Sequence, residues 1–257
     1  MSKNSFARYP SLQKKAVLIT GGGSGIGAAM VEHFAEQGAQ VAFFDLSSDA
    51  SLKLVERLTP VTEPAPIFLH CDVTDTPALQ ESIRKVEERL GRIDVLVNNA
   101  ARDDRHRWEE VTPDYWNASM AVNLHHHFFA IQAVANGMKV RGSGSIINMS
   151  SIAWLIPSTG LPAYVAAKAA IVGLTRTMAH ELGEAGIRVN CVLPGGILTE
   201  RQRRLWWTPE YEHEIMSNQC IKRTLTPDDV ARLVLFLAAD DSSAISNQSY
   251  IVDGGWA

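Results

Sequence analysis

The feature that most constrains the fold is a regular alternation of two kinds of segment along the chain. Short runs that are apolar at almost every position alternate with longer stretches in which apolar residues recur at helical spacing. A run that is apolar throughout is typical of a strand buried on both faces, as in a parallel sheet covered by helices. The runs are 15–20, 40–46, 65–73, 94–100, 144–151, 187–195 and 248–255.

The stretches between these runs complete the pattern. Several begin at a Ser, Thr or Asp that can cap a helix, and two reach a glycine, Gly91 or Gly183, as expected of a helix end. The predicted helices are 25–39, 48–58, 76–91, about 112–138, 161–183 and 226–240. Such alternation predicts an α/β fold with one domain, 1–257, built on a Rossmann-like, doubly wound, seven-stranded parallel sheet.

One segment departs from the alternation. Residues 198–221 lie between the last two predicted strands, and they are too polar for a core and too long for a simple connection. We expect them to form a small helical lid over a substrate. The lid contains Trp206 beside Trp207, and adjacent side chains cannot share one face of a helix or strand. We expect one indole to pack the lid onto the domain and the other to cover the substrate; a subunit contact made by both is the alternative.

The charge and the apolar pattern exclude several classes of partner. A net charge of −4 gives no indication of nucleic-acid binding. No apolar run approaches the ~18 residues of a membrane helix, and the first residues lack an apolar signal segment. We therefore expect neither a nucleic acid nor a membrane as partner, and a cytoplasmic location. Cys71, Cys191 and Cys220 are too scattered for a disulfide framework.

A glycine-rich turn, TGGGSGIG (20–27), connects the first predicted strand directly to a helix. Its glycines let backbone N–H groups approach a pyrophosphate, and the helix N-terminus favours negative charge. Asp45 ends the second predicted strand, where a carboxylate binds ribose hydroxyls and repels a 2′-phosphate. No Arg or Lys in the turn or directly after Asp45 offsets this charge. The sequence therefore predicts NAD, rather than NADP, as cofactor.

Three further residues are candidates for catalysis. Tyr164 and Lys168 are four positions apart on a predicted helix and therefore share a face. A neighbouring ammonium stabilises phenolate, so we expect a lowered pKa for Tyr164 and a role as general base. Ser151 ends the fifth predicted strand, at the edge of a parallel sheet where ligands bind.

Over essentially its whole length the chain resembles the short-chain dehydrogenase/reductase family. The motifs that carry the resemblance are TGGGSGIG (20–27), CDVT (71–74), NNAA (98–101), VN (122–123), SS (150–151), YVAAK (164–168), PGGILT (194–199) and VDGG (252–255). One departure is Ala101, where glycine usually follows NNA. The resemblance implies an NAD(P)-dependent dehydrogenase acting on CH–OH groups, and a homotetramer.

The resemblance also implies roles for individual residues. Tyr164 resembles the catalytic base or acid, Lys168 the group that binds the nicotinamide ribose and tunes the tyrosine, and Ser151 the group that hydrogen-bonds the reacting oxygen. Asn123 resembles the residue that holds a water in the proton relay. The implied cofactor residues are Gly21, Ser24, Gly25, Ile26, Gly27, Asp45, Asp72, Val73, Asn99, Ala100, Tyr164, Lys168, Pro194, Gly195, Ile197 and Thr199.

The variable loops point to a sugar as substrate. They are rich in hydrogen-bonding groups and tryptophan, which suit a polyhydroxylated ring better than a steroid or acyl chain. DDRH (103–106), SIAW (151–154), the lid and QC (219–220) resemble bacterial aldose 1-dehydrogenases of the D-xylose and L-fucose types. The candidate substrate residues are Asp103, Arg105, Trp154, Arg201, Gln202, Trp206 and Trp207.

This resemblance implies oxidation of the anomeric (C1) hydroxyl of a cyclic aldose to a lactone, with hydride transfer to NAD. The aldose would be of the L-fucose, L-galactose, D-arabinose or D-xylose type. Two alternatives stay open: a 3-oxoacyl or ketone reductase, or other secondary-alcohol dehydrogenase, of the same family, and a dinucleotide-binding regulator without chemistry.

Three consecutive histidines, His125, His126 and His127, superficially suggest a metal site. On a helix they point some 100° apart and cannot all face one ion. We expect them at a helix surface or an interface, and the sequence predicts no metal.

Overall fold

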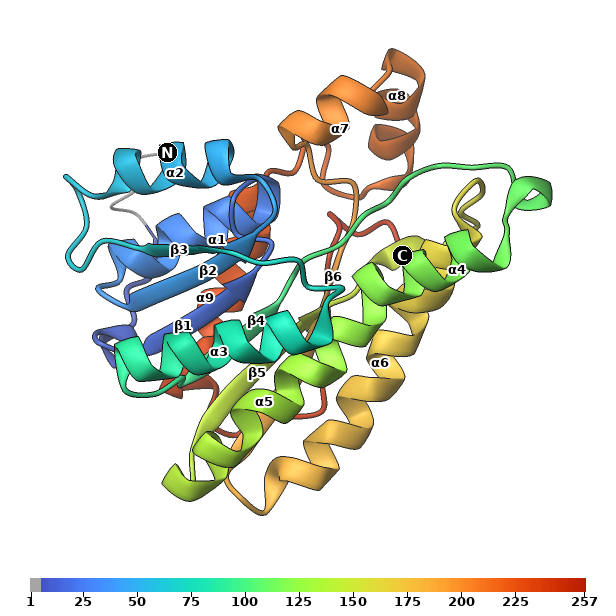
Figure 1. Cartoon of the computed structure of the whole chain (residues 1–257). Coiled ribbons are helices and arrows are strands. Elements are labelled where there is room, and N and C mark those ends of the chain that lie inside the picture. Colours follow the sequence, from blue (N-terminus) through green and yellow to red (C-terminus); the bar gives the residue numbers. More distant parts are fainter. Residues whose placement is uncertain (1–5) are drawn as a thin grey trace.

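Parallel strands form the centre of the protein, in a computed structural model that describes residues 6–257 (Figure 1). The strands are β1 Ala16–Thr20, β2 Gln40–Asp45, β3 Ile67–His70, β4 Val95–Asn98, β5 Gly144–Met149, β6 Ile187–Pro194 and β7 Ser249–Val252. Their order across the sheet is β3-β2-β1-β4-β5-β6-β7, so the direction of winding reverses beside β1. This order confirms the predicted Rossmann-like, doubly wound, seven-stranded parallel sheet.

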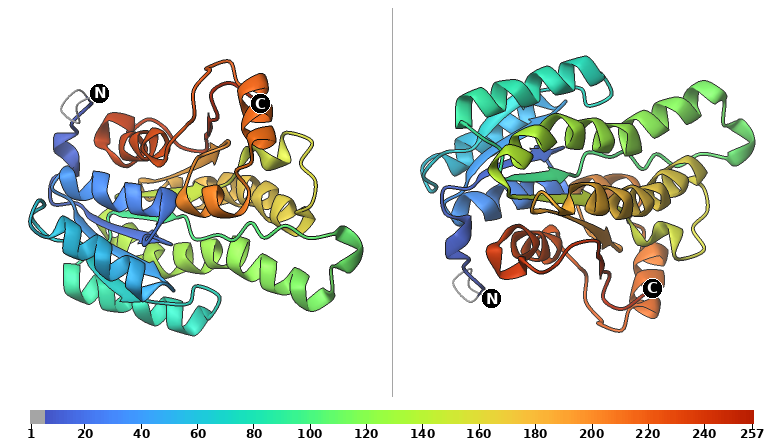
Figure 2. Two further views of the ribbon diagram at one scale, coloured as in Figure 1. Left: turned by 90° about the horizontal axis from the view of Figure 1, so that it is seen from above. Right: turned by 90° about the horizontal axis from the view of Figure 1, so that it is seen from below.

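Helices cover both faces of the sheet (Figure 2). Helices α1, α2 and α9 pack on one face, and α3, α5 and α6 pack on the other. The α-helices of the described residues are α1 Gly25–Glu36, α2 Ser48–Leu58, α3 Thr76–Leu90, α4 Pro113–Met120, α5 His126–Arg141, α6 Pro162–Gly183, α7 Glu200–Leu205, α8 Pro209–Asn218 and α9 Pro227–Ala238. None of the helices in residues 6–257 is long and apolar enough to cross a membrane.

The side chains of β1 show why the predicted strands are apolar at nearly every position. All five residues of β1 are buried. Val17 and Ile19 join the core beneath α1 and α9, whereas Leu18 joins the core beneath α3 and α5. Burying each such side chain contributes ~1.5–3 kcal/mol. A polar residue without a hydrogen-bond partner on either face would therefore weaken the sheet.

The third strand is shorter than predicted. It ends at His70, whereas the apolar run continues to Val73. The side chain of Asp72 accepts hydrogen bonds from the backbone N–H (2.9 Å) and the hydroxyl (2.7 Å) of Thr74. These local bonds compete with the sheet ladder and turn the chain into the loop before α3.

The long helix predicted at about 112–138 is interrupted. Between α4 and α5 lies a π-helical turn, Ala121–His125, and α5 continues to Arg141. A π-helical turn holds more residues per turn than an α-helix, so it rotates the faces on either side of it relative to each other. The helix ends before Gly142, which is in the left-handed conformation (φ 65°) expected at a helix C-terminus.

The lid predicted at 198–221 contains the short helices α7 and α8, which are orange in Figure 1 and stand clear of the sheet. The hydroxyl of Thr199 caps α7 by accepting from the N–H of Gln202 (3.1 Å). The hydroxyl of Thr208 caps α8 by accepting from the N–H of Tyr211 (3.2 Å). Each helix thus begins at the threonine that its sequence supplies.

The segment that follows β6 is attached to the start of α9. Ile197 pairs with Leu225 in an isolated parallel bridge, and the carbonyl of Leu225 accepts from the N–H of Leu198 (2.9 Å). Leu225 lies two residues before the first residue of α9. The N-terminus of this helix therefore positions the stretch from which Ile197 and Thr199 are predicted to contact the nicotinamide.

One carboxylate holds the N-terminus of α9 in place. Asp229 accepts from the backbone N–H of Thr226 (2.9 Å) and forms ion pairs with Arg223 (2.7 Å) and Arg232. Burial raises the pKa of Asp229, but the hydrogen bonds from Arg223 and Thr226 outweigh it and lower the pKa to about 2. Asp229 is therefore ionised and bonded over the whole physiological range.

We predict that Asp229→Ala lowers the free energy of unfolding by about 2 kcal/mol at neutral pH, because α9 loses its capping carboxylate and both ion pairs. Because folding depresses the pKa of Asp229, its stabilising contribution is present above the ordinary value of 3.8 and is lost as pH falls toward 2. Urea unfolding at several pH values measures both effects.

As control, Glu200→Ala removes an exposed pair with Arg203 (4.0 Å) and is expected to change stability by less than about 0.5 kcal/mol. Equal losses in the two variants would contradict this interpretation.

Candidate active site

Two adjoining cavities lie at the C-terminal ends of the strands. The larger, the long cleft, has a volume of about 850 Å³ and extends from the glycine-rich turn to Tyr164. The smaller, the inner pocket, has a volume of about 330 Å³ and extends from Tyr164 to α8. The residues that line both are Ile26, Asn99, Ala101, Asp103, Tyr164, Thr199 and Gln202. A ligand in one cavity would therefore share walls with a ligand in the other.

Most of the predicted cofactor residues line the long cleft. They are Gly21, Ser24, Ile26, Gly27, Asp45, Asp72, Val73, Asn99, Ala100, Tyr164 and Thr199. Lys168, Pro194, Gly195 and Ile197 line the inner pocket instead. Gly25 lines neither cavity; a Cβ there would lie 3.3 Å from Cγ2 of Thr199. The structure thus gathers the predicted set at one edge of the sheet.

Several positions of the glycine-rich turn leave no room for a Cβ, among them Gly21 and Gly27. Gly21 has a φ of 67°, and a Cβ there would lie 2.8 Å from Cα of Ala100. A Cβ at Gly27 would lie 1.8 Å from the carbonyl oxygen of Gly21. The turn leads into the N-terminus of α1, where free N–H groups and the helix dipole attract a phosphate. The backbone is therefore close-packed behind a surface suited to a pyrophosphate.

Asp45 is held in place by two backbone donors. Its Oδ2 accepts from the N–H of Gly23 (2.8 Å), and its Oδ1 accepts from the N–H of Ser47 (2.8 Å). Each carboxylate oxygen keeps a second lone pair, and the side chain lines the long cleft. A carboxylate fixed in this way fits the hydroxyls of a ribose. The turn, the helix N-terminus and Asp45 together fit a dinucleotide.

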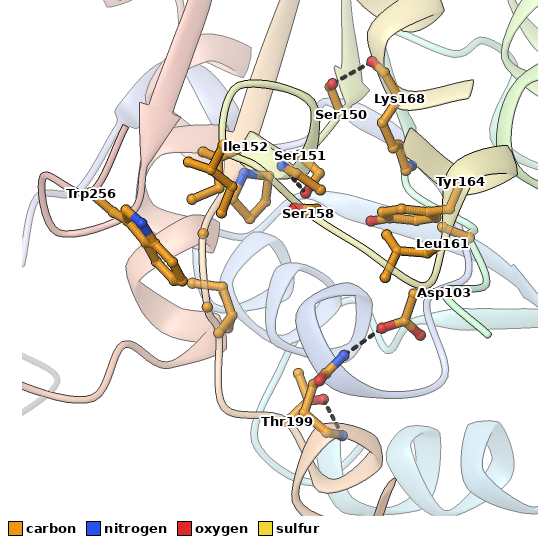
Figure 3. Close-up of a pocket in the computed structure, with 18 of the residues that line it drawn as sticks. Asp103, Ser150, Ser151, Ile152, Ser158, Leu161, Tyr164, Lys168, Thr199 and Trp256 are labelled. Carbon is orange, nitrogen blue, oxygen red and sulfur yellow. Dashed lines mark hydrogen bonds between the residues drawn. The ribbon is translucent and has the colours of Figure 1, made fainter. Parts of the chain in front are cut away.

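Ser151, Tyr164 and Lys168 come together in the inner pocket (Figure 3). Lys168 is 1% exposed, and its Nζ donates to the carbonyl of Met149 (2.8 Å) and lies 5.5 Å from the centre of the Tyr164 ring. Burial lowers the pKa of Lys168 to about 8. The end of β5 and one face of α6 thus place the predicted catalytic residues at the junction of the two cavities.

The pKa of Tyr164 differs from our prediction. Part of the ring faces the inner pocket, but the phenol lies deep among protein atoms, and this burial raises its pKa above the usual value. The carboxylate of Asp103 adds to the rise, and hydrogen bonding to Ser151 opposes it. The pKa is thus raised rather than lowered as we expected, because the largest influence on it is the lost hydration of the phenolate.

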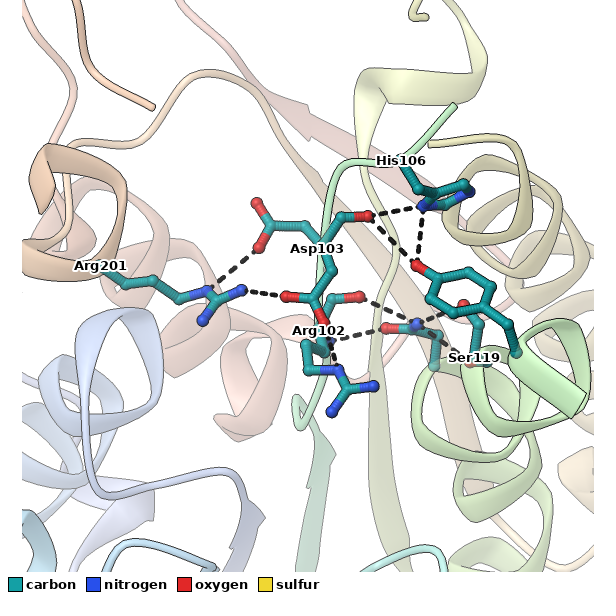
Figure 4. Close-up of polar contacts among 8 residues, drawn as sticks. Arg102, Asp103, His106, Ser119 and Arg201 are labelled. Carbon is teal, nitrogen blue, oxygen red and sulfur yellow. Dashed lines mark hydrogen bonds and ion pairs between the residues drawn. The ribbon is translucent and has the colours of Figure 1, made fainter. Parts of the chain in front are cut away.

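Asn123 lies in the π-helical turn, is buried and lines neither cavity. Its Oδ1 accepts from the N–H of Arg102 (2.9 Å), and its Nδ2 donates to the carbonyls of Arg102 (3.0 Å) and Ser119 (3.0 Å) (Figure 4). The side chain therefore holds the segment that follows β4. The part implied for Asn123 in a proton relay stays a prediction.

The two neighbouring tryptophans of the lid face different surroundings. Trp207 lines the inner pocket, with its ring centre 5.8 Å from that of Tyr211. Trp206 lines neither cavity; the guanidinium of Arg105 lies 5.0 Å from its ring centre and 5.3 Å from that of Tyr211. One indole thus faces the pocket while the other packs the lid on the loop after β4. Covering of a substrate by Trp207, and the alternative of a subunit contact by both indoles, stay predictions.

The same loop is joined to the lid by charged and polar contacts. Arg201 pairs with Asp103 (Nε–Oδ1 3.2 Å) and with Asp104 (Nη2–Oδ1 2.8 Å), as Figure 4 shows. Gln202 donates to the second oxygen of Asp103 (2.6 Å). Both carboxylates are partly exposed, so each ion pair is weak by itself, and their combination fixes the position of α7.

The remaining predicted substrate residues separate into three groups. Asp103, Arg105 and Gln202 line the inner pocket. Arg201 lines the long cleft. Trp154 lines neither cavity and packs against the core cluster around Ile152.

The sequence interpretation missed Tyr211, Glu214 and Trp256, which also line the inner pocket. Tyr211 and Glu214 are three positions apart on α8, and this helical spacing was the available signal. Trp256 is held by Asp253, whose carboxylate accepts from its backbone N–H (3.1 Å). In Figure 3, Trp256 forms the wall opposite Tyr164. No spacing rule predicts that Trp256 and Tyr164 line the same pocket, because the two residues belong to distant segments of the chain.

The three consecutive histidines correct another prediction. His125 is exposed, as expected, but His126 and His127 are buried, with 1% and 0% exposure. The prediction of surface or interface positions was wrong for these two because they lie on the face of α5 that packs on the core, together with Ala130 and Ile131. Within residues 6–257, no three His, Cys, Asp or Glu side chains gather as a metal site.

Comparisons with known proteins accord with this geometry. A family model described as Enoyl-(Acyl carrier protein) reductase matches residues 21–257. The chain is 50% identical to the Probable galactose dehydrogenase GalD of Rhizobium meliloti (strain 1021), over 97% of each chain. It is 48% identical to a D-xylose 1-dehydrogenase of Caulobacter vibrioides, over 98% of this chain and 99% of that protein. A solved structure of 7α-hydroxysteroid dehydrogenase, complexed with NADH and 7-oxo glycochenodeoxycholic acid, superposes with a TM-score of 0.91 at 32% identity, over 100% of this chain and 98% of that one.

We predict that Gly27→Ala weakens NADH binding at least ~100-fold, because the new Cβ collides with the carbonyl of Gly21 and opens the turn. NADH fluorescence titration measures the affinity, and circular dichroism checks that the fold is kept. Gly173→Ala is the matched control: no atom lies within 4 Å of its Cβ position in α6, so binding is expected to be unchanged. Retention of wild-type affinity in Gly27→Ala would refute the proposed role of the turn.

Proposed function

The chain belongs to the short-chain dehydrogenase/reductase family, and on this basis we propose that it is an aldose 1-dehydrogenase. In this proposal it oxidises the C1 hydroxyl of a cyclic aldose to a lactone and transfers the hydride to NAD. The observation that carries the proposal is the inner pocket, which combines Ser151 and Tyr164 with a wall of hydrogen-bonding and aromatic side chains.

The lining of the inner pocket supports a neutral, polyhydroxylated substrate. Asp103, Gln202 and Glu214 offer acceptors and donors for several hydroxyl groups. Trp207 and Tyr211 add aromatic faces against which the C–H face of a sugar ring can pack. A long acyl chain would leave these polar groups without partners, which costs free energy. The names of the two curated relatives, a galactose and a xylose dehydrogenase, support the same class.

The proposed chemistry follows from the contacts of three residues. The hydroxyl of Ser151 accepts from the N–H of Ala153 (3.1 Å), which orients it so that its own proton can be donated to the reacting oxygen. Tyr164 exchanges the proton of the substrate's C1 hydroxyl: as phenolate it accepts the proton during oxidation, and as phenol it returns one in the reverse direction. When bound, NAD supplies the hydride acceptor. Lys168 holds a positive charge next to Tyr164 and thereby favours the phenolate.

Asp45 supports NAD as the preferred cofactor. Its carboxylate is fixed by two backbone N–H groups and lines the long cleft at the end of β2. There it accepts from ribose hydroxyls and repels a 2′-phosphate. The residues that directly follow, Leu46 and Ser47, carry no charge to offset this repulsion.

A panel of pentoses, hexoses and 6-deoxyhexoses, assayed with NAD and NADP, tests the proposal. We expect one stereochemical series to be oxidised, with kcat/KM at least ~10-fold higher with NAD. We expect Tyr164→Phe to lose at least ~100-fold in kcat while it still binds NADH, because only proton transfer is removed. Substantial turnover by this variant would reject the role of Tyr164. Faster reduction of 3-oxoacyl substrates with NADPH would favour the reductase alternative, and NADH binding without turnover on any alcohol would favour a regulator.

The tryptophan pair gives a second prediction. Trp207→Ala is expected to raise KM for the sugar about 10-fold and to leave KM for NAD unchanged, because its indole lines only the inner pocket. Trp206→Ala is expected to act through lid packing, because Trp206 contacts Arg105 and lines neither cavity. It should therefore raise KM for the sugar less than Trp207→Ala does. Steady-state kinetics separates the two, and an unchanged sugar KM in both variants would reject the lid as a substrate wall.

A further inference from the structure

His126 is a buried polar residue that the proposed mechanism does not use. It is 1% exposed, and its Nε2 lies 2.9 Å from the carbonyl oxygen of Ala100. Ala100 lines the long cleft directly after β4. A side chain on α5 therefore reaches the wall of the predicted dinucleotide site from behind.

The segment that forms this wall is bonded on two sides. On the side of β1, the hydroxyl of Thr20 accepts from the N–H groups of Asn99 (2.9 Å) and Ala100 (3.0 Å). On the helix side, the side chain of Asn123 binds both the N–H and the carbonyl of Arg102. The bond from His126 to Ala100 lies between these two attachments.

The π-helical turn brings Asn123 and His126 to the same segment. Asn123 lies within the turn Ala121–His125, and His126 is the first residue of α5. The two residues are three positions apart and bind backbone groups two residues apart, at Arg102 and Ala100. π-helical turns occur frequently at functional sites, and here the turn aims two side chains at one strand end.

The charge state of His126 decides how it bonds. Burial lowers its pKa to about 3, and the bond to the backbone at Ala100 opposes this shift without overcoming it. Lys168 on α6 and the neighbouring His125 lower its pKa further. The imidazole is therefore neutral at physiological pH. Because the carbonyl oxygen can only accept, the proton is on Nε2.

We propose that His126 is a positioning residue for the dinucleotide: its Nε2–H fixes the carbonyl of Ala100 and, with Asn123, sets the wall of the long cleft at 99–102. The proposal depends on the proposed function only for the identity of the ligand. Without this donor, the carbonyl of Ala100 loses its partner, and the wall is free to shift away from the position that contacts the cofactor.

His127 provides a matched control in the same helix. It is also fully buried, but its Nδ1 lies 3.3 Å from Oδ1 of Asn148, on the adjacent strand β5. Its imidazole thus bonds the core and not the segment 99–102. Replacing either histidine by phenylalanine fills a similar volume and removes one imidazole, so a difference between the variants reports the bond to Ala100.

The test measures NADH binding by fluorescence titration, together with hydrogen exchange of the amides at 99–102 in the ligand-free protein. We expect His126→Phe to weaken NADH binding about 10-fold and to speed exchange at these amides by a similar factor. We expect kcat at saturating NAD to stay within about threefold. His126→Gln, which keeps an N–H donor of similar reach, is expected to restore most of the affinity, and His127→Phe to leave it unchanged.

Wild-type NADH affinity in His126→Phe, or an equal loss in His127→Phe, would overturn the proposal. If His126→Phe does not fold, His126→Asn replaces it, since its shorter side chain does not reach Ala100. Equal NADH affinity of the Asn and Gln variants would then overturn the proposal. A wild-type protein that binds NADH and oxidises no sugar would refute the proposed substrate and leave the role of His126 standing.

Discussion

The rest of the site depends on the hydrogen bonds that join the end of β1 to the end of β4. Thr20 is fully buried, and its hydroxyl accepts from the N–H groups of Asn99 and Ala100. The side chain of Asn99 returns two bonds, to the carbonyls of Thr20 (3.0 Å) and Gly21 (2.9 Å). These strands are neighbours because the sheet reverses its winding beside β1. The glycine-rich turn begins at this point, and so does the wall that His126 and Asn123 support.

The candidate catalytic residues depend on a second junction, between β5 and α6. The hydroxyl of Ser150 donates to the carbonyl of Lys168 (2.6 Å), and Nζ of Lys168 donates to the carbonyl of Met149 (2.8 Å). Each element thus satisfies a polar group of the other, so Ser151 and Tyr164 are held at a fixed separation. Lys168 is buried, so its charge acts on Tyr164 through protein rather than through water. Protein screens a charge less than water does, and the interaction is therefore stronger.

The sequence predicts the position of a residue where that position depends on its neighbours in the chain or on a regular helix or strand pattern. The strands were predictable because burial on both faces makes them apolar throughout, and Tyr164 and Lys168 because a spacing of four places them on one helical face. The burial of His126 follows the spacing of the α5 face that also holds Ala130 and Val134, so the signal was present, but no spacing rule predicts that its imidazole bonds the carbonyl of Ala100. The raised pKa of Tyr164 also depends on long-range packing, which no spacing rule contains. The lid is intermediate: the helical spacing of Tyr211 and Glu214 carried the information, but only with knowledge of where the lid lies.

Asp103 lines both cavities and also hydrogen-bonds the lid, and this affects the free energy of ligand binding. Any ligand that changes the bonds of Asp103 to Arg201 or Gln202 changes the free energy of holding the lid in place. The second ligand then binds to a protein whose lid equilibrium has already shifted. Reciprocity requires each ligand to alter the affinity for the other by the same factor. A sugar and a dinucleotide that both change these bonds would therefore be coupled through one carboxylate.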